Sequence, residues 1–198
     1  MAYIYERRKE LLHTAEKLQR EQFEKSIRSL EKLYAGEERR RKVVETFAGL
    51  ARQWEEQNEG TRKAASLGIC YLYSSILRKD YRFRLVLLGE EFWLDGEPIE
   101  ADWELSDFFS YFENDMEIVI EKLRGMFVRL CSAEEDAVRQ WCAEYYLAAV
   151  SKLCTDMAEE IAEGMGLEGM EKTEEFCFFF GHYQGDGEII WRNKKEEM

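Results

Sequence analysis

The stretch Tyr-Arg-Phe-Arg-Leu-Val-Leu-Leu at residues 81–88 decides how the rest of the chain is interpreted. Its first five residues alternate aromatic or aliphatic side chains with arginines, and this period of two predicts a β-strand. Asp95-Gly96 follows, a strong short-range signal of a β-hairpin. Residues 99–103 then return as the partner strand. Pro98 places that strand at the edge of the sheet, because proline donates no backbone hydrogen bond.

The residues before this strand have the period of helices. Residues 4–34 predict one long helix with a narrow apolar stripe, and residues 37–58 predict a second helix. The short connection at Gly36 favours an antiparallel hairpin of the two, a long N-terminal hairpin over residues 1–58 that protrudes and offers a homodimer interface. A third helix is expected from about residue 61 to Arg78, with Thr61 as its N-terminal cap.

The residues after the first β-hairpin predict two more helices and a second β-hairpin. Ser106 is expected to cap a helix to about residue 131, and residues 132–135 match a capping box that opens a helix lasting to about residue 163. Residues 176–180 are apolar on both faces, so this strand must be covered on both. The predicted fold class is α+β and helix-dominated, with about five helices and a small antiparallel sheet from two β-hairpins. A single domain is expected over residues 1–198, with a frayed tail at 192–198.

The charges of the chain are unevenly distributed. The net charge is −13, yet residues 90–121 carry twelve acidic residues and no lysine or arginine. Such a segment repels itself unless it faces something positive. One interpretation is internal neutralisation by the basic residues 1–89, of which Arg82 and Arg84 are nearest in sequence. The other is an acidic face that meets a basic partner.

The second interpretation gives the predicted function. The protein is expected to be a non-catalytic cytoplasmic interaction protein, similar in action to an inhibitor or immunity protein. It would bind a basic protein through an acidic, aromatic face at about residues 90–121, where carboxylates steer the partner and aromatic rings anchor it. The predicted partner-binding residues are Glu91, Trp93, Asp95, Glu97, Glu100, Asp102, Trp103, Glu104 and Asp107.

Two other classes of function stay open. An enzyme or small-molecule binder would use an aromatic-lined interior pocket, with His182 as its titrating group. A structural homo-oligomer would assemble through the N-terminal helices.

The five cysteines include no C-x-x-C pair, which favours buried thiols in a reducing cytoplasm.

Other chemistries find little support in the sequence, and no catalytic residue is predicted. Glu10 and His13 have the spacing of half a carboxylate-bridged metal site, but the chain holds only two histidines, so no metal or cofactor is expected. The glycine pattern at 164–169 follows a helix, whereas a dinucleotide-binding loop follows a strand. Glutamates bracket the basic run 39–42, which disfavours nucleic-acid binding. No apolar run approaches the length of a membrane-spanning helix.

Overall fold

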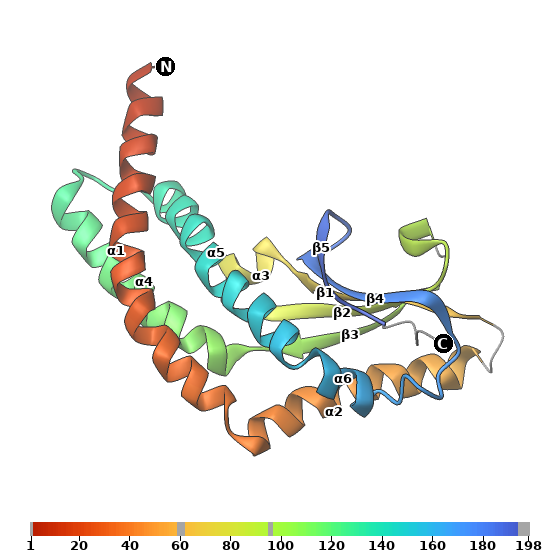
Figure 1. Cartoon of the computed structure of the whole chain (residues 1–198). Coiled ribbons are helices and arrows are strands. Elements are labelled where there is room, and N and C mark those ends of the chain that lie inside the picture. Colours follow the sequence, from red (N-terminus) through yellow and green to blue (C-terminus); the bar gives the residue numbers. More distant parts are fainter. Residues whose placement is uncertain (1, 59–61, 95–96, 194–198) are drawn as a thin grey trace. The chain divides into compact units, whose positions relative to one another are not determined.

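The computed structural model describes residues 2–58, 62–94 and 97–193 (Figure 1). Over these ranges the protein is α+β, with six α-helices, one short 3-10 helix and a five-stranded mixed sheet. The helices are α1 (Ala2–Tyr34), α2 (Glu37–Asn58), α3 (Tyr73–Arg78), η1 (Phe92–Leu94), α4 (Ser106–Met126), α5 (Ser132–Asp156) and α6 (Ala158–Gly164). The strands are β1 (Ala64–Tyr71), β2 (Arg82–Leu88), β3 (Ile99–Glu104), β4 (Lys172–His182) and β5 (Gly187–Arg192).

The chain forms two compact units, each assembled from three separate segments. Unit 1 contains α1 up to Leu33, α3, α4 and the first part of α5, up to Ala149. Unit 2 contains α2, the whole sheet with η1, the last residues of α5, and α6. Both predicted N-terminal helices are present, but they belong to different units. Their antiparallel arrangement, the single domain and a dimer through residues 1–58 therefore stay predictions.

The sheet of unit 2 has the order β3-β2-β1-β4-β5. Both predicted hairpins are confirmed, since β2 pairs antiparallel with β3 and β4 pairs antiparallel with β5. The predicted small antiparallel sheet is only partly right, because β1 lies between the hairpins and runs parallel to β4. The strand after Pro98 is an edge strand, as predicted. The Asp95-Gly96 turn lies outside the described residues.

The predicted third helix is wrong over most of its length. Residues 64–71 form the central strand β1, and only Tyr73–Arg78 is helical. Because β1 has neighbours on both sides and is covered on both faces, its side chains from Ser66 to Cys70 are all buried. A strand of this kind shows no alternation of apolar and polar residues, so its period does not distinguish it from a buried helix. Thr61 lies outside the described residues.

Four predicted helix boundaries also change, one of them at the end of α4, which stops at Met126 rather than at about residue 131. Ser106 is the first helical residue rather than the cap, and the preceding Leu105 makes no side-chain capping bond. At α5 the capping box is shifted by one residue, because the Cys131 amide donates to the carboxylate of Glu134 (3.1 Å). Cys131 is exposed and Cys177 is only partly buried, against the expectation that the thiols are buried. The expected helix 132–163 is interrupted at Met157, which separates α5 from α6.

The two faces of the sheet are covered differently. On one face α2 contributes Phe47, whose ring contacts Trp103 of β3 edge-on at 5.5 Å. On the other face η1 places Phe92 and Trp93 against Phe179 of β4. Residues 176–180 therefore form an internal strand, as their apolar character predicts.

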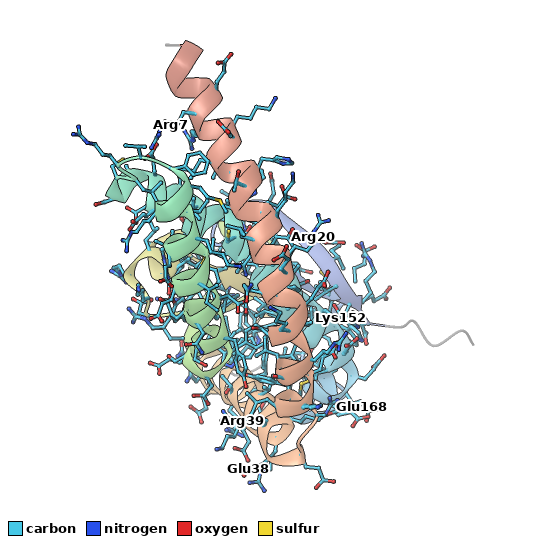
Figure 2. The ribbon with its side chains drawn as sticks, turned by 90° about the vertical axis from the view of Figure 1, so that its left-hand side faces the viewer. Arg7, Arg20, Glu38, Arg39, Lys152 and Glu168 are labelled. Carbon is cyan, nitrogen blue, oxygen red and sulfur yellow. The ribbon has the colours of Figure 1, made fainter. Side chains whose placement is uncertain are left out.

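Unit 1 is helical, and its core contains both aromatic rings and polar groups. Phe109 and Phe112 of α4 pack against Tyr146 of α5, with ring centroids 6.0 and 5.2 Å apart. Arg7 and Arg20 project from α1 (Figure 2), and Arg7 forms an ion pair with Glu134 of α5 (2.7 Å). This pair joins the two helices near the start of α5.

Candidate functional site

The candidate site is the β2–β3 hairpin of unit 2 with η1, which connects its strands. Its carboxylates come from β3 and its arginines from β2, because the register pairs Arg84 with Asp102. Arg84 forms ion pairs with Glu100 (2.9 Å) and Asp102 (3.0 Å). Arg82 approaches Asp102 at 3.4 Å. These two arginines therefore neutralise the charges of Glu100 and Asp102 within the protein.

Tyr183 joins these charges to the aromatic residues of η1. Its hydroxyl donates a hydrogen bond to Glu100 (2.7 Å). This bond, with burial and the charge of Glu100, raises the pKa of Tyr183. The Tyr183 ring also contacts Trp93 edge-on, with centroids 5.6 Å apart. Sequence reasoning missed Tyr183, because it lies 83 residues from Glu100 and nothing in a turn after a strand reveals so distant a partner.

The remaining acidic residues around the hairpin are exposed. No lysine or arginine of the described residues forms an ion pair with their carboxylates, although Arg62 donates a hydrogen bond to the Glu97 carbonyl (3.1 Å) and Arg82 lies opposite Glu104 in the register of the hairpin. We call this group the acidic surface: Glu90, Glu91, Glu97 and Glu104.

Exposed apolar residues lie in η1, between Glu91 and Glu97 in sequence. Leu94 is 86% exposed and Phe92 is 42% exposed. Leu94 projects into water, whereas the Phe92 ring also packs against Trp93 and Phe179. An exposed apolar side chain flanked by acidic residues resembles the anchor of a protein interface. The Trp93 indole nitrogen and the Ser66 hydroxyl are buried and have no hydrogen-bond partner among the described residues.

The other predicted partner-binding residues have different surroundings. Trp103 is only 5% exposed and belongs to the core of unit 2, on the face opposite Asp102. Asp107 lies in the first turn of α4 in unit 1, where a carboxylate suits the helix dipole. Asp95 lies outside the described residues. The structure thus brings together Trp93, Glu100 and Asp102 through Tyr183 and Arg84, but not Trp103.

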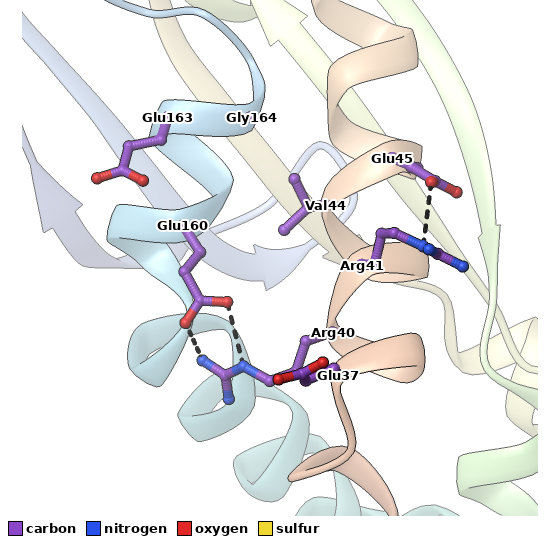
Figure 3. Close-up of a pocket in the computed structure, with 8 residues that line it drawn as sticks. All are labelled: Glu37, Arg40, Arg41, Val44, Glu45, Glu160, Glu163 and Gly164. Carbon is purple, nitrogen blue, oxygen red and sulfur yellow. Dashed lines mark hydrogen bonds and ion pairs between the residues drawn. The ribbon is translucent and has the colours of Figure 1, made fainter.

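A hollow of about 540 Å³ lies between α2 and α6 in unit 2 (Figure 3). Arg40 spans it and binds both carboxylate oxygens of Glu160, while Arg41 approaches Glu45 at 3.5 Å. Lys42 pairs with Glu38 at 2.9 Å. These ion pairs compensate most of the basic run 39–42, and the pair of Arg40 with Glu160 joins α2 to α6 across the hollow.

Unit 1 contains one buried carboxylate, Asp115, and one partly buried carboxylate, Glu113, and each binds several donors. Asp115 of α4 is 4% exposed and accepts hydrogen bonds from Tyr146 (2.7 Å) and Ser26 (2.8 Å). Burial raises the pKa of Asp115 and outweighs these hydrogen bonds. Burial also raises the pKa of Glu113, but hydrogen bonds from Arg139 and Lys79 reverse the effect, and the net shift is downward. Both carboxylates hold the helices of unit 1 together.

His182 packs against an aromatic ring, and Cys70 and Cys142 are buried. His182 ends β4 and contacts the ring of Tyr71 edge-on at 5.7 Å. Burial raises the pKa of Cys70 and of Cys142 to about 12, which keeps both thiols protonated at neutral pH. Over residues 2–58, 62–94 and 97–193, no three His, Cys, Asp or Glu side chains are grouped as ligands for a metal ion.

Comparison with known proteins identifies no relative. No protein-family model, no curated protein and no solved structure matches the chain. In the part of the chain that the structure describes, no helix is both long and apolar enough to cross a membrane.

Proposed function

We propose that this protein is a non-catalytic interaction protein, which binds a basic protein partner in the cytoplasm through the acidic surface and η1. It would act in the manner of an inhibitor or an immunity protein. The observation that carries the proposal is the exposure of Leu94 and of part of Phe92 in a segment flanked in sequence by carboxylates that form no ion pair with a described lysine or arginine.

The energetics support this assignment. Folding does not require carboxylates without ion pairs at these positions. Lysines would keep the surface equally well hydrated and would remove the repulsion between neighbouring carboxylates. Carboxylates around an apolar centre accelerate encounter with a basic protein and repel acidic ones. The apolar centre then supplies the burial that holds the complex together.

The proposal is tested by affinity capture from a lysate of the native host with three forms of the protein. The first is the wild type, and the second carries glutamine at all four positions of the acidic surface. The third is a control with the same change in net charge, made at exposed glutamates elsewhere in unit 2: Glu55, Glu56, Glu168 and Glu171.

The wild type and the control are expected to capture the same basic protein, and the surface variant about tenfold less of it, since several weak charge pairs are lost together. Raising the salt concentration should weaken the capture by the wild type. Equal capture by all three forms, or the absence of any basic protein, would contradict the proposal.

A further inference from the structure

The strand β3 has an open side. It is the terminal strand of the sheet and pairs only with β2, so no described strand pairs with its other side (Figure 1). Unpaired N–H and C=O groups along such an edge form a template for another extended chain.

The register shows which residues of β3 present these groups. Just beyond the strands, the Leu105 amide donates to the Tyr81 carbonyl (3.1 Å). In an antiparallel pair, hydrogen-bonded and non-hydrogen-bonded residues alternate. Trp103, Ala101 and Ile99 therefore bond to β2, and the residues between them direct their backbone groups outward. These outward-directed residues are Glu100, Asp102 and Glu104.

The same residues carry all three carboxylates of β3. We infer that the open edge of β3 binds an extended basic segment of the partner as an additional strand, an inference that rests on the proposed function. In the added strand, residues opposite the three carboxylates lie on the same face of the sheet. Lysine or arginine at every second position would therefore meet a carboxylate, which is shared with Arg84 at Glu100 and Asp102 and has no ion pair at Glu104.

The intervening residues of the added strand would extend the opposite face, where Ile99 and Trp103 are buried against the core of unit 2. Apolar residues are favoured there. A second copy of β3 is disfavoured, because it would place carboxylates opposite carboxylates. The charges therefore select a basic strand with alternating character over self-association.

The other border of the sheet provides an internal control. β5 is also an edge strand, but its sequence Gly-Glu-Ile-Ile-Trp-Arg carries one acidic and one basic residue. Glu188 of β5 is exposed, as Glu104 of β3 is. Charge reversal at Glu188 and at Glu104 thus makes the same chemical change at the two edges.

The experiment measures binding of two short peptides to the full-length protein at low salt by fluorescence anisotropy. In one peptide lysine alternates with valine and threonine, and in the other the same residues are arranged with the lysines in one block. The alternating peptide is expected to bind about tenfold more tightly.

N-methylation of its backbone at the lysines should abolish this advantage, because it removes the donors to the edge. E104K should weaken binding about fivefold to tenfold, since attraction becomes repulsion, and E188K should not change it.

The remaining outcomes separate the two proposals. Equal binding of both peptides, lost in the variant with four glutamines at the acidic surface, would overturn strand addition and leave the proposed function standing. Insensitivity to N-methylation, or equal effects of E104K and E188K, would also overturn strand addition. If neither peptide binds, the acidic residues of β3 only protect the edge against association, and the strand-addition inference is overturned. The proposed function fails only if the capture experiment also finds no basic protein.

Discussion

Asp115 shows how a single residue in unit 1 balances burial against hydrogen bonding. Its carboxylate accepts bonds from Tyr146 and Ser26, and Gln19 approaches it at 3.4 Å. All three groups donate, which suits the ionised form, yet burial is the larger effect and raises the pKa. Ionisation of Asp115 therefore costs folding free energy. Stability associated with this group is fully present below the unfolded pKa of about 4 and is lost as the pH rises through the folded pKa.

Asp115→Asn removes this titration and keeps an acceptor for the Tyr146 hydroxyl. We expect the stability of the variant relative to wild type to increase between about pH 4 and pH 7. Asp115→Ala instead removes the carboxylate that accepts from the Tyr146 hydroxyl and leaves a cavity, so it should cost roughly 2–4 kcal/mol at about pH 4 and less at pH 7, because it removes the same titration. Urea unfolding at the two pH values measures both effects. An Asn variant whose relative stability falls as the pH rises would show that hydrogen bonding outweighs burial.

Glu134 has the opposite behaviour, because its ionised form is favoured in the folded state. Hydrogen bonds from Arg7 and then from the Cys131 amide lower the pKa of Glu134 from 4.5 to about 2. Its stabilising effect is therefore present above about pH 4.5 and is lost as the pH falls through the folded pKa. Glu134→Gln should cost about 1 kcal/mol at pH 7, since it weakens a helix cap and an ion pair.

The cost of Glu134→Gln should become smaller as the pH falls from about 4.5 toward 2. Urea unfolding midpoints over this range measure it, with Glu121→Gln on α4 as the control at an exposed position. A cost that is equal at pH 7 and at pH 3 would show that the carboxylate charge does not contribute.

At the scale of elements, the sequence predicts α1, α2, α4 and both β-hairpins, but not β1. The successful predictions rest on patterns that a surface element must show, such as the alternation in β2 or the apolar stripe of α1. β1 has no solvent-facing side, so its alanine, leucine and isoleucine residues resemble a helix. The break between α5 and α6 at Met157 was missed because no glycine or proline marks it.

Gly68 provides a direct test of the β1 assignment. A Cβ at Gly68 would lie within 2.5 Å of the Phe179 ring, which η1 holds in place. Gly68→Ala should therefore destabilise the protein by about 1–3 kcal/mol. In a helix the same change would stabilise by up to about 1 kcal/mol. Gly125→Ala in α4 is the control, because nothing lies near its Cβ, and thermal melting compares the two. A more stable Gly68→Ala variant would contradict the strand.

At the scale of the whole molecule, the acidic segment 90–121 was the feature of the sequence that pointed to a site. In the structure its carboxylates near the β2–β3 hairpin form two groups. The arginines of β2 compensate Glu100 and Asp102, as the nearest basic residues in sequence suggest. The acidic surface has no such partner among the described residues. Sequence reasoning found the segment but did not separate these groups, because register and exposure decide which carboxylate meets an arginine. For the same reason it placed Trp103 on the proposed face rather than in the core.

The central claim is that the acidic surface serves a partner and not the fold, and the melting temperature of the purified protein tests it most directly. Three proteins are compared at low and at high salt: the wild type, the variant with glutamine at the four positions of the acidic surface, and E100Q/D102Q. Loss of the paired carboxylates should lower the melting temperature of E100Q/D102Q by about 2–4 °C at low salt, and less at high salt. Glutamine at the acidic surface should leave the melting temperature unchanged or raise it by about 1–3 °C at low salt, because repulsion is relieved. A salt-dependent fall in the melting temperature of that variant would contradict the claim.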